Sequence, residues 1–358
     1  MITRDDMRAG VAAGIVTEAQ AATMLALADS RRGARENLAA GDEPFELFKG
    51  FNEIFIVVGL GILALGYFGV AALWVAVGYA DVPTRMFIAA LIGAGALWLL
   101  AEYFVRRRRM IAPAIALSVM FAGCAALGLF AQFAQPFMVA QQEFSSVPLP
   151  IALTTLAILI FWLRFKVPFA MAMIALGLFA TALVLAAEQA GTPVGIAELF
   201  LLSAGGPFAW ITLVLGIVVF CVAMAFDMSD PHRVTRRSAN GFWLHVIAAP
   251  ALVNTVALSL LSQGTPGANT ALLGFLALIA VVAIVIDRRS FLIAGVGYAV
   301  TLSATVMDGE GSVYTVLLVG VFLVLLGAFW ERIRAGILRA LPAFPGKDRL
   351  PPYGAQVS

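Results

Sequence analysis

Charged residues are scarce in this chain. Of its 358 residues only 12% are Asp, Glu, Lys or Arg, whereas 62% are hydrophobic. A soluble domain has about 25% charged and about 45–50% apolar residues. Such an excess of apolar residues excludes an ordinary soluble domain and indicates that lipid is the solvent for most of the chain.

Cysteine and histidine are also rare, which limits the chemistry that the chain can support. Cys124 and Cys221 lie inside apolar runs, so we expect no structural disulfide. His232 and His245 are too few for a His-rich metal site. The zinc-protease, serine-hydrolase and phosphate-loop motifs are absent. We therefore predict no catalytic residue, no metal and no cofactor. The sequence disfavours an enzyme but leaves an intramembrane enzyme open.

Long apolar segments, by contrast, dominate the chain after residue 50. Most approach the length of about 20 residues that a helix needs to cross hydrocarbon, although the fourth and eighth are short. The ten segments lie at about residues 52–79, 86–105, 110–134, 147–163, 167–188, 208–227, 241–262, 270–286, 290–307 and 312–330. We predict an all-α, polytopic membrane helix bundle of about ten transmembrane helices, arranged as five hairpins.

The basic residues predict how these helices are threaded. If the N-terminus lies inside, 22 of the 23 Lys and Arg residues fall in inner segments and only Arg85 falls outside. The positive-inside rule requires this alternation for an even number of spans, so both termini are predicted to be cytoplasmic. The basic residues form no long tract with interleaved aromatics, and we expect no nucleic-acid partner.

Three parts of the chain are expected. Residues 1–47 are predicted to form a cytoplasmic helical hairpin and linker, in which Thr17 and Gln20 have the spacing of a capping box. Residues 48–341 form the transmembrane domain, whose last helix is predicted to continue along the interface, and residues 342–358 form a cytoplasmic tail.

Two functions are open for the hairpin at residues 1–32. It either orients the membrane domain as a lid, or it binds a cytoplasmic protein partner. The outer segments 136–150 and 189–207 are long and contain Pro and Gly. They are interpreted as lids, packed caps or re-entrant pieces.

Charge is missing from the middle of every predicted span, which disfavours a proton or sodium pump with a deeply buried titrating group. Glu53, Asp227 and Asp287 lie within about one or two turns of the inner interface. These three acids are candidate polar or gating residues.

The seventh segment is the most polar and contains His245, Pro250 and Asn254. His245 is predicted about 6 Å past the start of the helix. There it either hydrogen-bonds Asp227 or Asp287, or acts as a gate or proton relay. Asn254 is nine residues further on, which places it on the opposite face, as an interhelical hydrogen-bonding group or a cavity contact. Pro250 lies on the side of Asn254 and frees a backbone carbonyl.

Arginines near two membrane helices are candidates for contact with anionic lipid headgroups on the cytoplasmic side. Arg233, Arg236 and Arg237 would share one face of a short helix after the sixth span, although their spacing also serves as a topology signal alone. Arg332 and Arg334 lie on the predicted interfacial extension of the last helix.

Four stretches of the chain together resemble one family of bacterial polytopic inner-membrane proteins with a short N-terminal cytoplasmic helical hairpin. These stretches are "AGIVTEAQAATML", "FNEIFIVVGLGILALG", "DPHRVTRRSANGFWLHVIAAPALVNT" and "FWERIRAGILRALP". The family has no assigned biochemical function, so the resemblance implies a bacterial cytoplasmic membrane but no substrate and no catalytic residues.

Two functional hypotheses follow from these observations. The first is a transporter-like or binding protein for a small or lipid-like molecule, suggested by the number of spans, the polar seventh helix and the long outer loops. The alternative is a non-transporting accessory or sensor protein, which recruits a cytoplasmic partner through its N-terminal hairpin.

Overall fold

The structure is a computed structural model whose parts fall into two compact units, Met1–Asp42 and Glu43–Ser358. It describes residues 10–17, 20 and 24 of the first unit, and residues 51–77, 81–141, 143–231, 233, 236–306, 310–351 and 353 of the second. In the first unit, the Thr17 N–H donates to Gln20 Oε1 (3.0 Å) and the Gln20 N–H donates to Thr17 Oγ1 (3.3 Å). The predicted capping box is therefore confirmed, while most of the predicted hairpin lies outside the described residues.

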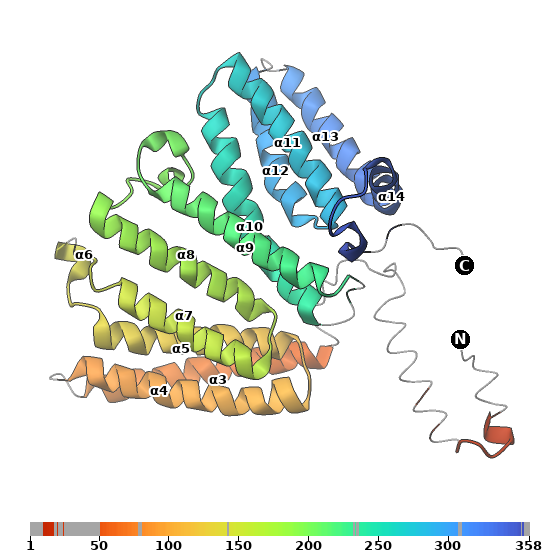
Figure 1. Cartoon of the computed structure of the whole chain (residues 1–358). Coiled ribbons are helices and arrows are strands. Elements are labelled where there is room, and N and C mark those ends of the chain that lie inside the picture. The colour runs from red at the N-terminus through yellow and green to blue at the C-terminus, as the bar shows by residue number, and fades with distance from the viewer. Residues whose placement is uncertain are drawn as a thin grey trace. The chain divides into compact units, whose positions relative to one another are not determined.

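The described part of the second unit consists of helices and contains no strand (Figure 1). Its long helices are α3 (Phe51–Ala76), α4 (Val82–Ala101), α5 (Ala112–Phe133), α7 (Pro148–Phe165), α8 (Phe169–Ala190), α9 (Phe208–Met228), α10 (Arg236–Leu261), α11 (Pro266–Ile286), α12 (Ser290–Val306) and α13 (Glu310–Ala328). A π-helix, η1 (Glu102–Arg107), follows α4, and a shorter helix, α14 (Trp330–Ala340), follows α13.

Each long helix coincides with one predicted apolar segment. Within the described residues, the eight helices from α3 to α11, with η1 continuing α4 and the short α6 left out, are long and apolar enough to cross a membrane. In α12 the apolar stretch Ser290–Leu302 is shorter. The prediction of an all-helical chain with several helices able to span a membrane is confirmed by these eight helices.

Most helices pack against helices that are close to them in the chain, and the helices from α3 to α8 are referred to below as the first helix group. Figure 1 shows α3, α4, α5, α7 and α8 side by side, followed by α9 to α13, and α8 contacts both α9 and α10. An aromatic core holds the first group together, with Trp98 packed edge-on against Phe161 and Phe165. The α9–α10 interface instead uses small residues such as Ala223 and Ala248, which let the two backbones approach closely.

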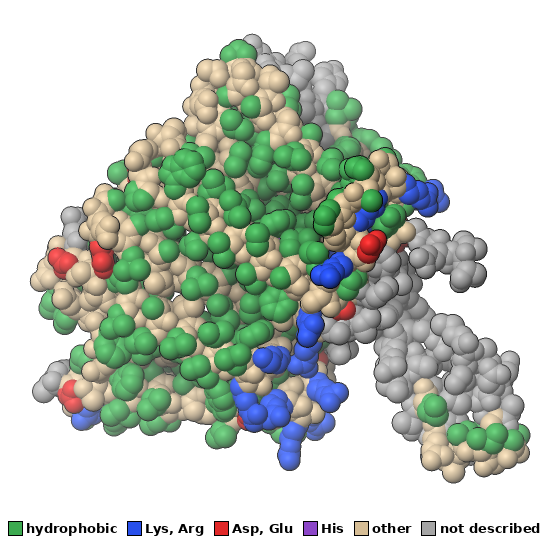
Figure 2. All heavy atoms as spheres, in the orientation of Figure 1, with side chains coloured by type: hydrophobic (Ala, Val, Ile, Leu, Met, Phe, Trp, Pro, Cys, Tyr) green, Lys and Arg blue, Asp and Glu red, His purple; other side chains and the backbone are tan. Residues whose placement is uncertain are grey.

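The outer surface of this unit is apolar. Leu65, Leu73 and Leu99 are each more than 70% exposed. Figure 2 shows hydrophobic side chains across most of the described face, with Lys and Arg gathered near one end of the first helix group. Water would disfavour such a surface, whereas hydrocarbon matches it.

The last membrane helix does not continue straight into its predicted extension. Phe329 has φ −113° and ψ 18°, which ends α13 and makes α14 a separate helix. The turn allows α14 to pack on α11 instead of continuing straight. The predicted tail also packs on this unit, since Leu350 is buried and the Pro351 carbonyl accepts a hydrogen bond from Arg334.

The two long segments that the sequence predicts on the outer side contain short helices, α6 (Met138–Gln141), η2 (Ile196–Leu199) and η3 (Leu202–Ala204). The second segment is fastened to α10: the Leu202 N–H donates to Ser259 Oγ (2.9 Å), and the Ser259 hydroxyl donates to the Phe200 carbonyl (3.2 Å). Of the three interpretations, this contact favours a packed cap over the end of α10.

Candidate functional site, a buried charge cluster

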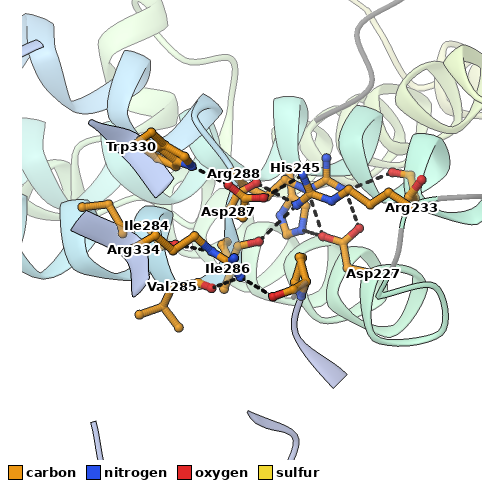
Figure 3. Close-up of polar contacts among 12 residues, drawn as sticks. Asp227, Arg233, His245, Ile284, Val285, Ile286, Asp287, Arg288, Trp330 and Arg334 are labelled. Carbon is orange, nitrogen blue, oxygen red and sulfur yellow. Dashed lines mark hydrogen bonds and ion pairs between the residues drawn. The ribbon is translucent and has the colours of Figure 1, made fainter. Parts of the chain in front are cut away.

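Five ionisable side chains meet where α9 ends, α10 begins and α11 turns into α12 (Figure 3). They form the buried charge cluster, which consists of Asp227, Arg233, His245, Asp287 and Arg288. Each is less than 10% exposed, and His245 and Arg288 are fully buried. Uncompensated charge is costly in such a place, so the geometry of the partners decides whether the cluster is stable.

One half of the cluster is centred on the carboxylate of Asp227, at the end of α9. His245 Nε2 lies 3.0 Å from Asp227 Oδ2, and because a carboxylate only accepts, Nε2 carries the proton in this hydrogen bond. Arg288 donates from Nε to Oδ2 (2.9 Å) and from Nη2 to Oδ1. Arg288 Nη2 also donates to the Ser238 carbonyl (3.0 Å), so one arginine connects α9, α10 and the start of α12.

The other half is centred on Asp287, which ends α11 in the left-handed conformation, with φ 59°. Arg233 forms an ion pair with its carboxylate (Nη1 to Oδ2, 3.0 Å) and donates from Nη2 to its backbone carbonyl (2.8 Å). The indole Nε1 of Trp330 donates to Asp287 Oδ1 (2.6 Å). These bonds join the α9–α10 connection to α11 and α14.

A fourth basic residue, Arg334, holds α14 against this half of the cluster. It donates from Nε to the carbonyl of Ile284 (3.1 Å) and from Nη2 to those of Val285 (3.4 Å) and Pro351 (2.7 Å). The first two carbonyls belong to the last turn of α11, where the ordinary donors four residues further along the helix are missing. Burial lowers the pKa of the Arg334 guanidinium, and the charges of Asp287 and Glu331 oppose this shift.

The residues packed around the cluster are small or aromatic. A Cβ at Gly241 would collide with the Asp227 carboxylate and would lie 3.2 Å from the Ala223 carbonyl, so glycine is what lets α10 approach this acid. The ring of His245 is packed edge-on against Phe220 and Phe291. Its Nδ1 atom is buried and has no hydrogen-bond partner among the described residues.

The structure brings together three of the six candidate polar or gating residues. Asp227, and not Asp287, is the partner of His245. The position of His245 differs from the prediction, because α10 begins at Arg236 and not near residue 241. The histidine is therefore roughly 14 Å along the helix and not about 6 Å.

The other three candidates are not members of the cluster. Glu53 instead accepts hydrogen bonds from the backbone N–H groups of Ile111 (3.3 Å) and Ala112 (3.0 Å), and so caps the start of α5 from α3. Asn254 is half-buried further along α10, and Pro250 is exposed within the same helix.

The predicted lipid-contact arginines divide into two sets. Arg236, Arg237 and Arg332 are exposed and can reach headgroups. Arg233 and Arg334 are buried and hold other parts of the protein, which corrects the prediction for both. Arg233 also has φ 52°, so it does not share a helical face with Arg236 and Arg237.

Sequence reasoning did not single out Arg288 and Trp330. They stand in the segments "IVIDRRS" and "AFWERIR", each of which places an acid beside an arginine directly after an apolar run. This pattern was the available signal, but ordinary interfacial residues give the same pattern. Within the described residues no group of three or more His, Cys, Asp and Glu side chains could hold a metal ion.

Comparison with protein-family models, curated proteins and solved structures finds no match to this chain. Eight apolar helices of spanning length and an apolar outer surface define the class, a multi-pass helical membrane protein. Its function must be argued from the charge cluster and the surface.

Proposed function

We propose that this protein is a ten-span, transporter-like protein of the bacterial cytoplasmic membrane that binds a small or lipid-like molecule, and that the buried charge cluster is its cytoplasmic gate. The observation that supports the gate is a set of buried contacts at one end of these helices. The Arg288–Asp227 and Arg233–Asp287 ion pairs and the His245–Asp227 hydrogen bond join α9, α10, α11 and the turn before α12. Ionisable groups within membrane helices are costly, and functional sites are where they usually occur.

A gate explains the presence of buried ionisable residues better than a static contact between helices does. Well-packed apolar residues hold buried helix ends together at least as well as ion pairs do. Ion pairs, however, can exchange between discrete partners when helices shift. The Asp227 carboxylate accepts hydrogen bonds from both His245 and Arg288, and the buried Nδ1 atom of His245 has no partner among the described residues.

The threading with both termini in the cytoplasm is part of this proposal. Polar contacts join α3 to α5 through Glu53, η1 to α7 through Glu102 and Arg164, and α7 to α10 through Arg236. Each contact links chain segments that the positive-inside rule assigns to the same side. The bacterial location rests on the resemblance noted above.

The binding function is tested with purified wild-type protein. Native mass spectrometry of several preparations identifies co-purified small molecules or lipids, and proteoliposomes measure their flux. We expect a reproducible bound species. The absence of both ligand and flux in all preparations would overturn the proposal.

The gate is tested by replacing the central ion pair with apolar side chains of similar size. Asp227→Leu combined with Arg288→Met keeps the joint packed, removes the Asp227–Arg288 ion pair and leaves the Arg233–Asp287 pair in place. We expect a folded protein whose flux changes about tenfold or more. The matched control, Glu102→Leu with Arg164→Met, removes an exposed interhelical pair in the first group and leaves flux unchanged. Unchanged flux in the cluster variant would contradict the gate.

A second function is supported by the division of the chain, since residues 1–42 form a unit of their own. A separate cytoplasmic module suits an accessory or sensor protein that recruits a partner. Deleting residues 1–45 distinguishes the two functions. An accessory protein loses its co-purifying partner while the membrane domain stays folded, whereas a transporter keeps its flux.

A further inference from the structure

A surface pocket of about 450 Å³ lies far along the sequence from the charge cluster, where α4 passes into η1. Leu99, Glu102, Tyr103, Arg106 and Arg107 line it. Its composition changes along the helix from aliphatic through aromatic to cationic. From Leu99 to Arg107 the rise is about 12 Å, comparable to the step from acyl chains to headgroups.

The backbone is irregular at this pocket. In η1 the Arg108 N–H donates to the Tyr103 carbonyl (3.0 Å), five residues earlier, which is the pattern of a π-helix. Single π-turns are frequent at functional sites. The guanidinium of Arg108 lies over the Tyr103 ring, 5.6 Å from its centre, and Nε donates to the phenol oxygen (3.2 Å).

Positive charge predominates in the pocket. Its single acid, Glu102, is already paired with Arg106 (3.1 Å) and with Arg164 of α7 (2.7 Å). Arg107 is exposed and forms no ion pair among the described residues. An arginine in this state offers a planar set of donors that fits a phosphate.

An apolar stripe leads away from the pocket along the same face of α4. Ile92 stands seven residues before Leu99, which is two helical turns, and the two side chains are 59% and 71% exposed. This apolar stripe would not contribute to the binding of soluble phosphate, whereas an acyl chain can lie along it.

We propose that this pocket binds an acidic phospholipid, with the phosphate at Arg106 and Arg107 and an acyl chain along Leu99 and Ile92. The basic end of the first helix group in Figure 2 matches the negative charge of such a lipid. The site is independent of the proposed gate, because it lies on different helices and needs no transport.

The test is photo-crosslinking with phosphatidylglycerol that carries a diazirine in its acyl chain. Wild-type protein in detergent should be labelled within residues 92–107, as found by peptide mapping. Replacing the probe with the corresponding phosphatidylcholine should lower this labelling about tenfold, since the net headgroup charge is lost.

Two variants at exposed positions test the two ends of the lipid. Arg107→Gln removes the free cation and Leu99→Asn removes the apolar contact, and each should reduce labelling within residues 92–107 about tenfold. Arg349→Gln, an exposed arginine outside the spans, is the matched control and should label as wild type does. The proposal is overturned if both variants label like wild type, or if the two headgroups label equally. Complete competition by millimolar inorganic phosphate would show a phosphate site and overturn the lipid assignment.

Discussion

Asp227 shows how one residue acquires its role from its neighbours. Its carboxylate lies at the end of α9, where the sequence predicts a candidate polar or gating residue near the interface. In the folded protein it is buried and accepts from both His245 and Arg288. The cluster is therefore sensitive to the loss of any one charge, because the remaining partner cannot reach water.

Asp227→Asn should destabilise the protein by about 3–5 kcal/mol, because Arg288 is left buried without its counter-charge. The thermal unfolding midpoint in detergent measures this loss. Glu188→Gln is the control, since Glu188 is exposed near the C-terminal end of α8, and it should change the free energy of unfolding by about 0.5 kcal/mol or less. Equal midpoints for the two variants would show that the Asp227 pairs do not stabilise the fold.

Glu53 illustrates the limit of sequence reasoning at this scale. A rare acid at the start of a membrane helix is a reasonable gating candidate, yet the folded chain uses it to cap α5. The residues that receive this cap, Ile111 and Ala112, are almost 60 positions away. No local pattern could identify them, because the contact depends on how α3 packs against α5.

At the scale of elements, the apolar runs predicted the helices well. A run of about 20 apolar residues must satisfy its backbone internally in hydrocarbon, so it becomes a helix whatever its neighbours are. The wrong predictions concern the ends of helices, where the backbone can also be satisfied by side chains and loops. The chain turns at Phe329, and α10 begins five residues before the predicted start, because side chains of the charge cluster and of α14 hold these ends in place.

Arg334→Ala should loosen α14 while leaving the other helices intact. The variant loses donors to the last turn of α11 and to Pro351, and we expect the local stability of α14 to fall by about 2–4 kcal/mol. Hydrogen–deuterium exchange of peptides from α14, compared with peptides from α9, measures the effect.

The control for this experiment is Arg332→Ala in the same helix. Arg332 is exposed and lies over the Phe329 ring, 5.7 Å from its centre. Its loss should leave the exchange of α14 nearly unchanged. If both variants protect α14 as well as the wild type does, the carbonyl contacts of Arg334 do not hold this helix.

At the scale of the whole membrane domain, the distribution of arginine predicts the side on which each loop lies. Single cysteines at Arg108 and Arg237 should react with a membrane-impermeant maleimide only after the cells are permeabilised. Cysteines at Gly191 and Gln263 should react in intact cells. The background carries Cys124→Ala and Cys221→Ala, which removes the natural thiols.

Labelling at Arg237 in intact cells would reverse the proposed orientation. Labelling of Arg108 and Arg237 on opposite sides would break the even alternation of spans. Either result would also change the side of the membrane on which the charge cluster and the lipid pocket face, because both lie at helix ends in the basic segments.

The sequence by itself determined the class of the protein and the positions of its helices, since apolar length and local hydrogen bonding are properties of contiguous residues. It also identified His245, its partner Asp227, and Asp287 in the other half of the cluster. Only the tertiary structure decided that Arg288 completes the cluster, that Arg233 and Arg334 are internal, and that Glu53 caps a neighbouring helix. Pairing of charges is decided by distance between helices that are remote in the chain, and helix packing sets that distance.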